Sequence, residues 1–138
     1  NVIRTPFQRS HDNIMDPQNS TFNVIRMFLA IKYSMNGLTD AFLREPAFRL
    51  ELIGALILVP VALWLGDSGL EKSILISAVF AVLVVEIINS AIEAAIDRVG
   101  PELNDLSRRA KDLGSAAVLL TLINVLVVWA LVLADQII

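Results

Sequence analysis

The chain has 138 residues and a formal net charge of −3, and 56% of its residues are hydrophobic, with a mean hydropathy of +0.68. This length allows one domain, and the apolar content is too high for an ordinary soluble domain. The charge gives no indication of nucleic-acid binding. The chain has no cysteine and only one histidine, His11, which excludes disulfides, thiol chemistry and a histidine-based metal site. A bound metal would therefore be a hard cation held by oxygens, which is typical of magnesium.

The amino-terminal region divides into a polar stretch and an expected helix. Residues 1–19 are polar, contain Pro6 and Pro17, and lack the apolar core of a signal peptide. We expect a disordered leader or extension there, followed by a single membrane-embedded domain over residues 20–138. A helix is expected from Ser20 or Thr21 to about residue 43. It combines an apolar side with several polar residues, a pattern that favours an amphipathic helix lying at the membrane surface.

Two apolar segments follow, each long enough to cross a bilayer with help from its ends. Pro46 is expected to begin the first of these helices, with Glu45 at its positive end and an apolar run over residues 52–65. A tight turn over residues 66–69 separates it from the second helix. This second helix runs from residue 70 and ends near Gly100-Pro101.

The carboxyl-terminal part begins with a charged segment. Residues 98–112 are rich in Arg, Lys, Asp and Glu and are expected to form a connection. A third helix is expected to open at Gly114 and to be apolar over residues 118–134. The sequence thus predicts an all-α membrane protein with three transmembrane helices and an amino-terminal surface helix. Because Lys and Arg favour the cytoplasmic side, the amino terminus and the 98–112 segment should be cytoplasmic, and the carboxyl terminus outside.

One face of the second helix carries an unusual set of polar side chains. At about 100° per residue, these side chains all lie within about 60° of Glu86. They are Glu86, Asn89, Ser90, Glu93 and Asp97. Glu86 and Glu93 are separated by about 10.5 Å of helix rise, which is too far for them to share one proton. The spacing instead suits one acid beside a lipid headgroup and the other beside a metal-bound phosphate. Ionisable groups at membrane depth are costly, and they usually indicate function.

Simpler interpretations exist for each part of this pattern. Asn89 and Ser90 could only join helices by hydrogen bonds, and Arg108, Arg109 and Lys111 could only set topology or contact headgroups. Acids and cations on the same side of the membrane instead favour a site for a magnesium-bound polyphosphate.

Three segments carry a resemblance to a known family. They are Glu-Ile-Ile-Asn-Ser-Ala-Ile-Glu-Ala-Ala-Ile-Asp-Arg at 86–98, Ala-Lys-Asp-Leu-Gly-Ser-Ala-Ala at 110–117 and Glu-Pro-Ala-Phe-Arg-Leu-Glu at 45–51. Together they resemble the bacterial integral-membrane diacylglycerol kinases. The resemblance implies a homotrimer of three-span subunits in the bacterial cytoplasmic (inner) membrane. It also implies transfer of the γ-phosphate of MgATP to diacylglycerol, giving phosphatidic acid.

The resemblance also implies roles for individual residues. Glu86 would be the catalytic base, and Glu45 and Glu93 would bind the metal. The nucleotide would be contacted by Glu45 and Glu93 and by Arg26, Tyr33, Glu102, Asn104, Lys111 and Asp112. The lipid would be contacted by Arg26, Glu86, Ser115 and Trp129. Asn89 and Asp97 match positions that support function without a separate role.

Three other functions are compatible with parts of the sequence. The same fold with undecaprenol as the acceptor would use the same motifs. A small proton-coupled transporter would use Glu86 or Glu93 as a relay, but it needs no basic cluster. A structural membrane subunit would need its acids for assembly and not for magnesium dependence.

Overall fold

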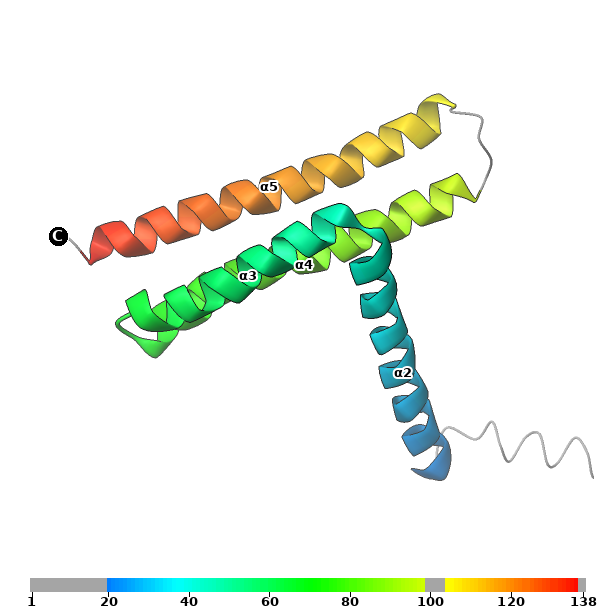
Figure 1. Ribbon diagram of the computed structural model, residues 1–138, viewed down its shortest axis with the longest axis horizontal. Coiled ribbons are helices and arrows are strands. Elements are labelled where there is room, and N and C mark those ends of the chain that lie inside the picture. The colour runs from blue at the N-terminus through cyan, green and yellow to red at the C-terminus, as the bar shows by residue number, and fades with distance from the viewer. Residues whose placement is uncertain (1–19, 99–103, 137–138) are drawn as a thin grey trace, which may run out of the picture. The chain divides into compact units, whose positions relative to one another are not determined.

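The structure, a computed structural model, describes residues 20–98 and 104–136. These residues are helical, with four helices in the described ranges and the connections between them (Figure 1). The helices are α2 (Ser20–Arg44), α3 (Pro46–Leu65), α4 (Gly69–Asp97) and α5 (Asp105–Asp135). The all-α prediction is confirmed. The predictions for residues 1–19 and for Gly100-Pro101 lie outside the described residues.

Helix α2 belongs largely to a unit of its own. The chain divides into two compact units, and the boundary falls between Asp40 and Ala41. The predicted start at Ser20 and the predicted end near residue 43 agree with the observed helix. Large apolar side chains of α2 such as Phe28, Ile31 and Leu38 are exposed. That α2 lies at a membrane surface remains a prediction.

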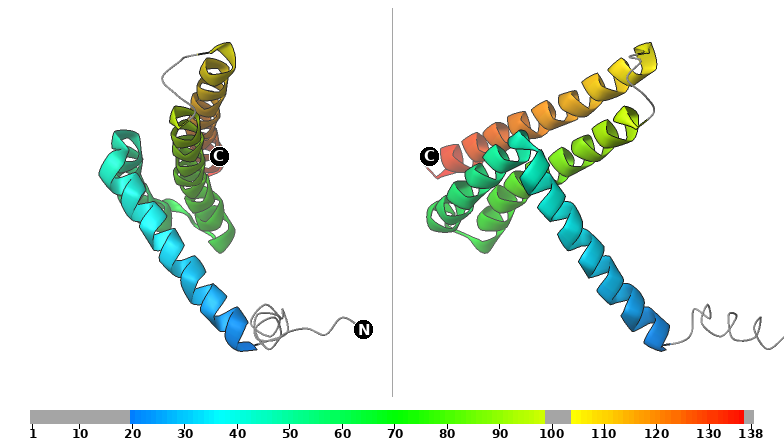
Figure 2. Two further views of the ribbon diagram at one scale, coloured as in Figure 1. Left: turned by 90° about the vertical axis from the view of Figure 1, so that its right-hand side faces the viewer. Right: turned by 45° about the vertical axis from the view of Figure 1, so that its right-hand side comes forward.

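Helices α3, α4 and α5 form the second unit, and each is long and apolar enough to cross a membrane. They run beside one another with the chain reversing direction at each connection (Figures 1 and 2). Helix α4 is the central one, because it contacts both α3 and α5 extensively. The three predicted spans are therefore confirmed.

Small side chains dominate the buried positions between these helices. Ala55 and Ala62 on α3 and Ala78 on α4 are buried, and Leu75 is the only large side chain in the described residues that is fully buried. Small residues allow helix backbones to approach closely, which is how helices associate in lipid. By contrast, no residue of the most apolar window of α5 is buried. The outer faces of this unit must therefore be covered by lipid or by protein.

The start of α5 corrects the sequence prediction. The predicted connection over residues 98–112 is helical from Asp105 onward, so α5 begins nine residues before Gly114. The side chain of Asn104 caps the helix by accepting a hydrogen bond from the Ser107 amide at 2.8 Å. Asp105 adds an acid to the first turn, where the helix dipole favours negative charge. The many charged residues of the 98–112 segment favour a loop, but the cap formed by the Asn104 side chain determines where the helix begins.

The connection between α3 and α4 is held by two sets of hydrogen bonds. The Ser68 hydroxyl accepts from the Glu71 amide at 3.1 Å, and the Glu71 carboxylate accepts from the Ser68 hydroxyl and from the Asp67 amide, each at 3.0 Å. This reciprocal pattern is a variant of the capping box, in which the acid accepts from the amide of Asp67, the residue before the N-cap, and not from the N-cap amide. The Gln136 side chain then donates to the Leu65 carbonyl at 3.0 Å and to Glu71 at 2.9 Å. The end of α5 is thereby fixed beside the α3–α4 turn.

The capping box gives a stability prediction. Ser68→Ala should lower the free energy of unfolding by about 1 kcal/mol, because the Glu71 amide loses its cap. Thermal unfolding in detergent micelles, followed by the fluorescence of the nearby Trp64, would measure the change. Ser77→Ala is the matched control, since its hydroxyl only donates to the Ile74 carbonyl within α4. Equal effects of the two substitutions would contradict the capping role.

Candidate functional site

The site is built around Glu86, which is the most buried charged side chain in the described residues at 4% exposure. Asn89, one turn further along α4, is also buried, and Glu93 is half-buried. Positions i, i+3 and i+7 lie on one face of a helix, so the three side chains point in similar directions. The predicted polar face is thus confirmed for these three residues.

Helix α3 brings a second pair of acids to the same place. Glu45 occupies the extended N-cap position of α3, and Pro46 follows it as the first helical residue. The Arg49 guanidinium donates to the carbonyls of Phe42 and Leu43, at 3.1 and 3.2 Å, and so satisfies the end of α2. These contacts fix the joint that holds Glu45. Glu51 follows on the next turns of α3.

A pocket of about 520 Å³ collects these side chains between α3, α4 and α5. We call it the acidic pocket. Its lining comprises Glu45, Pro46, Ala47, Glu51, Glu86, Asn89, Glu93, Ser115, Val118, Leu119 and Leu122. Four carboxylates therefore share one cavity, which gives it a negative potential that attracts a cation.

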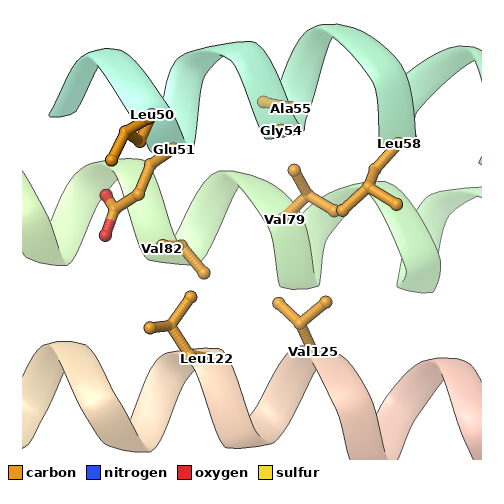
Figure 3. Close-up of a pocket in the computed structure, with 9 residues that line it drawn as sticks. All are labelled: Leu50, Glu51, Gly54, Ala55, Leu58, Val79, Val82, Leu122 and Val125. Atoms are coloured by element: carbon orange, nitrogen blue, oxygen red, sulfur yellow. The ribbon is translucent and has the colours of Figure 1, made fainter. Parts of the chain in front are cut away.

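A second pocket of about 270 Å³ adjoins the first along the groove between α3 and α5. We call it the apolar pocket. Its lining comprises Leu50, Glu51, Gly54, Ala55, Leu58, Val79, Val82, Leu122 and Val125 (Figure 3). Figure 3 shows Glu51 as the only charged side chain, at the end of the pocket beside Leu50. Glu51 and Leu122 line both pockets, so the acidic pocket and the apolar pocket are adjacent.

Glu51 is a candidate site residue that the sequence pattern did not predict. Its Oε2 atom is buried and has no hydrogen-bond partner. A buried carboxylate oxygen without a partner is costly, so a ligand that donated a hydrogen bond to it would offset that cost. The signal in the sequence was a lone acid just before the apolar run at residues 52–65, six positions after Glu45.

The cationic residues near the site are arranged in pairs with acids. Lys111 Nζ lies 2.5 Å from Asp97 Oδ1, which joins the ends of α4 and α5. Arg108 lies 2.9 Å from Asp112 within α5. The predicted nucleotide residues Lys111 and Asp112 thus lie on the first turns of α5. Neither lines the acidic pocket.

The remaining predicted residues are distributed as follows. Ser115 lines the acidic pocket with Glu45, Glu86, Asn89 and Glu93, whereas Ser90, Asp97 and Trp129 do not. The Trp129 indole nitrogen is buried and has no partner. Asn104 is the cap of α5. Arg26 and Tyr33 lie on α2 in the other unit, and Glu102 lies outside the described residues.

The acids of the acidic pocket suit one kind of metal. Within residues 20–98 and 104–136, no three His, Cys, Asp or Glu side chains are grouped closely enough to enclose an ion. Mg²⁺ is commonly bound by only one or two carboxylates, together with water and substrate phosphates. Glu45 and Glu93, at the polar end of the pocket, fit that pattern.

Comparison with known proteins gives a consistent result. The family model for prokaryotic diacylglycerol kinase matches residues 32–133. The diacylglycerol kinase of Escherichia coli K12 is 45% identical over 115 residues, which are 83% of this chain and 94% of the relative. The enzymes of Haemophilus influenzae and Pseudomonas aeruginosa are each 43% identical, over 79% and 78% of this chain and 92% and 88% of their own lengths. The chain therefore belongs to the prokaryotic diacylglycerol kinase family.

Proposed function

We propose that the chain transfers the γ-phosphate of MgATP to the hydroxyl of diacylglycerol, giving phosphatidic acid, at the cytoplasmic face of the bacterial inner membrane. The observation that carries the proposal is the adjacency of the two pockets, which places four carboxylates beside an apolar cavity between membrane-length helices. A polar phosphate donor and an apolar acceptor need such a combination. The names of the relatives support the choice of acceptor.

Glu86 is the proposed catalytic base. It is buried in the part of the acidic pocket that adjoins the apolar pocket through Glu51 and Leu122. A lipid hydroxyl in that position would transfer its proton to the Glu86 carboxylate. The hydroxyl oxygen would bond to the γ-phosphorus as the bond to the β–γ bridging oxygen breaks, and ADP would leave. The free oxygen of Glu51 would accept a hydrogen bond from the same lipid headgroup.

Glu45 and Glu93 are the proposed magnesium ligands. Both are carboxylates at the polar end of the acidic pocket, which suits a hard cation. When bound, the ion would offset the negative charge of the phosphate oxygens. The two side chains would hold the phosphates near Glu86, so their part in the reaction is positioning.

The other contacts proposed for the substrates follow the motif positions. Arg26, Tyr33, Glu102, Asn104, Lys111 and Asp112 would contact ATP, while Arg26, Ser115 and Trp129 would contact the lipid. Asp97 would act through Lys111, since their ion pair joins the ends of α4 and α5.

The proposed assembly is a homotrimer, with the amino terminus cytoplasmic and the carboxyl terminus outside. The exposed apolar face of α5 supports contacts with lipid or with other copies, because no residue in its most apolar window is buried within one chain. Both pockets are lined by α3, α4 and α5 of one chain, and a neighbouring copy packed on the exposed face of α5 would lie close to them.

The role of Glu86 is tested by Glu86→Gln. This substitution should lower phosphate transfer at least about 100-fold, because an amide cannot take the proton. Nucleotide binding and assembly should persist, since the side chain keeps its shape. The measurement is entry of label from radiolabelled ATP into diacylglycerol or, separately, undecaprenol, with and without magnesium.

The outcomes of this assay test the catalytic base, the acceptor lipid and the kinase activity separately. Near-normal turnover of Glu86→Gln would remove that residue from the role of base. If label enters undecaprenol and not diacylglycerol, the acceptor lipid is undecaprenol. An absence of label in both lipids with the unsubstituted protein would overturn the kinase proposal itself.

The metal ligands are tested by Glu45→Gln and Glu93→Gln. Each should raise the magnesium concentration for half-maximal activity at least about tenfold, the size expected from the loss of even an outer-shell partner. Activity as a function of magnesium at fixed ATP would measure this shift. Asp67→Asn is the control, because it changes an exposed acid at the other end of the helices. Loss of assembly with an unchanged magnesium requirement would favour a structural role.

The ion pair between Asp97 and Lys111 gives a further prediction. Asp97→Asn should raise the KM for ATP about two- to fivefold, the range expected for an exposed ion pair. The KM for lipid should not change. Asp105→Asn is the matched control, since Asp105 lies 4.0 Å from Arg108 at a fully exposed position. An effect on the lipid KM alone would contradict the proposed role of Lys111.

A further inference from the structure

Gly114 occupies a position that no other residue type could fill without displacing a neighbour. It is the only buried residue of α5, and a Cβ atom added there would overlap the side-chain oxygen of Asn89 on α4. Gly37 and Gly54, which are also helical, have nothing within 4 Å of the equivalent position apart from their chain neighbours and the backbone of their own helix. The requirement for glycine is therefore specific to this point of the α4–α5 contact.

The Asn89 carboxamide is held in one orientation at this contact. Its Nδ2 atom donates to Glu93 Oε1 at 3.0 Å, while its Oδ1 atom is buried without a hydrogen-bond partner and faces Gly114. Reversal of the amide would place its oxygen against the carboxylate, which cannot donate when ionised. The space at Gly114 thus accommodates the oxygen, and this leaves the amide hydrogens directed at Glu93.

We propose that Gly114 is a positioning residue for the metal-binding carboxylate. By leaving room for the Asn89 side chain, it allows Asn89 to orient Glu93 toward the phosphate-bound ion. Glu93 is long and half-buried, and within the described residues Asn89 donates a hydrogen bond to it. Partners that orient a metal ligand commonly change metal affinity 10- to 100-fold when they are lost, which is about the effect expected here. The inference rests on the proposed function, in which Glu93 binds magnesium.

The direct test is Gly114→Ala in the full-length protein. An added methyl group should displace Asn89 and weaken metal binding about tenfold. Mn²⁺ is the probe, and its binding is titrated by electron paramagnetic resonance in the presence of a non-hydrolysable ATP analogue and without lipid. The magnesium requirement of lipid phosphorylation is measured alongside. Gly37→Ala is the matched control, because its added methyl group meets nothing within 4 Å apart from its chain neighbours and the backbone of its own helix.

A double substitution separates positioning from general damage to packing. Asn89→Ala removes the side chain that the methyl group would displace, and it should weaken Mn²⁺ binding by itself. Adding Gly114→Ala to Asn89→Ala should then cost little more, because coupled residues do not act additively. If Gly114→Ala alone fails to assemble, the double variant should assemble again.

The outcomes distinguish this inference from the proposed function. Unchanged Mn²⁺ binding in Gly114→Ala, or a full additional loss in the Asn89→Ala background, would overturn the positioning role. If Glu93→Gln also leaves Mn²⁺ binding unchanged, the metal role of Glu93 fails as well. If Glu93→Gln weakens binding while Gly114→Ala does not, only the positioning role is lost.

Discussion

The structure depends on one constraint, which is that polar side chains on a membrane-length helix need partners inside the protein. Glu86 and Asn89 lie on α4 among apolar residues, and both are buried between helices. Leaving such groups in hydrocarbon would be costly. Helix α5 therefore meets α4 at Gly114, where there is room for Asn89, and α3 begins at the joint that brings Glu45 to the same pocket. The small residues between α3 and α4 allow this close approach.

In the proposed function, the two pockets receive two substrates of opposite polarity. Glu51 and Leu122 belong to both the acidic and the apolar pocket, so the two pockets lie side by side. A lipid hydroxyl could remain attached to buried acyl chains while its oxygen lies among carboxylates. Phosphoryl transfer requires mainly positioning and neutralisation of charge. A small protein without histidine or cysteine at the site can supply both through its carboxylates.

Much of the fold and part of the site could be predicted from the sequence. The 3.6-residue period placed Glu86, Asn89 and Glu93 on one face, and Pro46 marked the start of α3 because its fixed backbone angle suits a first turn. Hydropathy could not locate the start of α5, since charged residues form helices readily once Asn104 supplies a cap. Glu51, Gly114 and the Asp97–Lys111 pair depend on contacts between helices. A period within one helix carries no information about such contacts.

The unequal lengths of the three helices have a consequence for the surrounding bilayer. The hydrogen bonds of Gln136 align α5 with the α3–α4 turn, so the three helices share a common end there. Helix α3 has 20 residues, whereas α4 and α5 have 29 and 31. At 1.5 Å per residue, the longer helices therefore extend beyond α3 by about 14 and 17 Å at the opposite end. A bilayer whose hydrocarbon thickness matches the length of α3 leaves Glu93, Asp97 and Lys111 in water. A thicker bilayer would place these three side chains closer to the hydrocarbon region. Hydrophobic mismatch should thus make catalysis sensitive to the acyl-chain length of the host lipid.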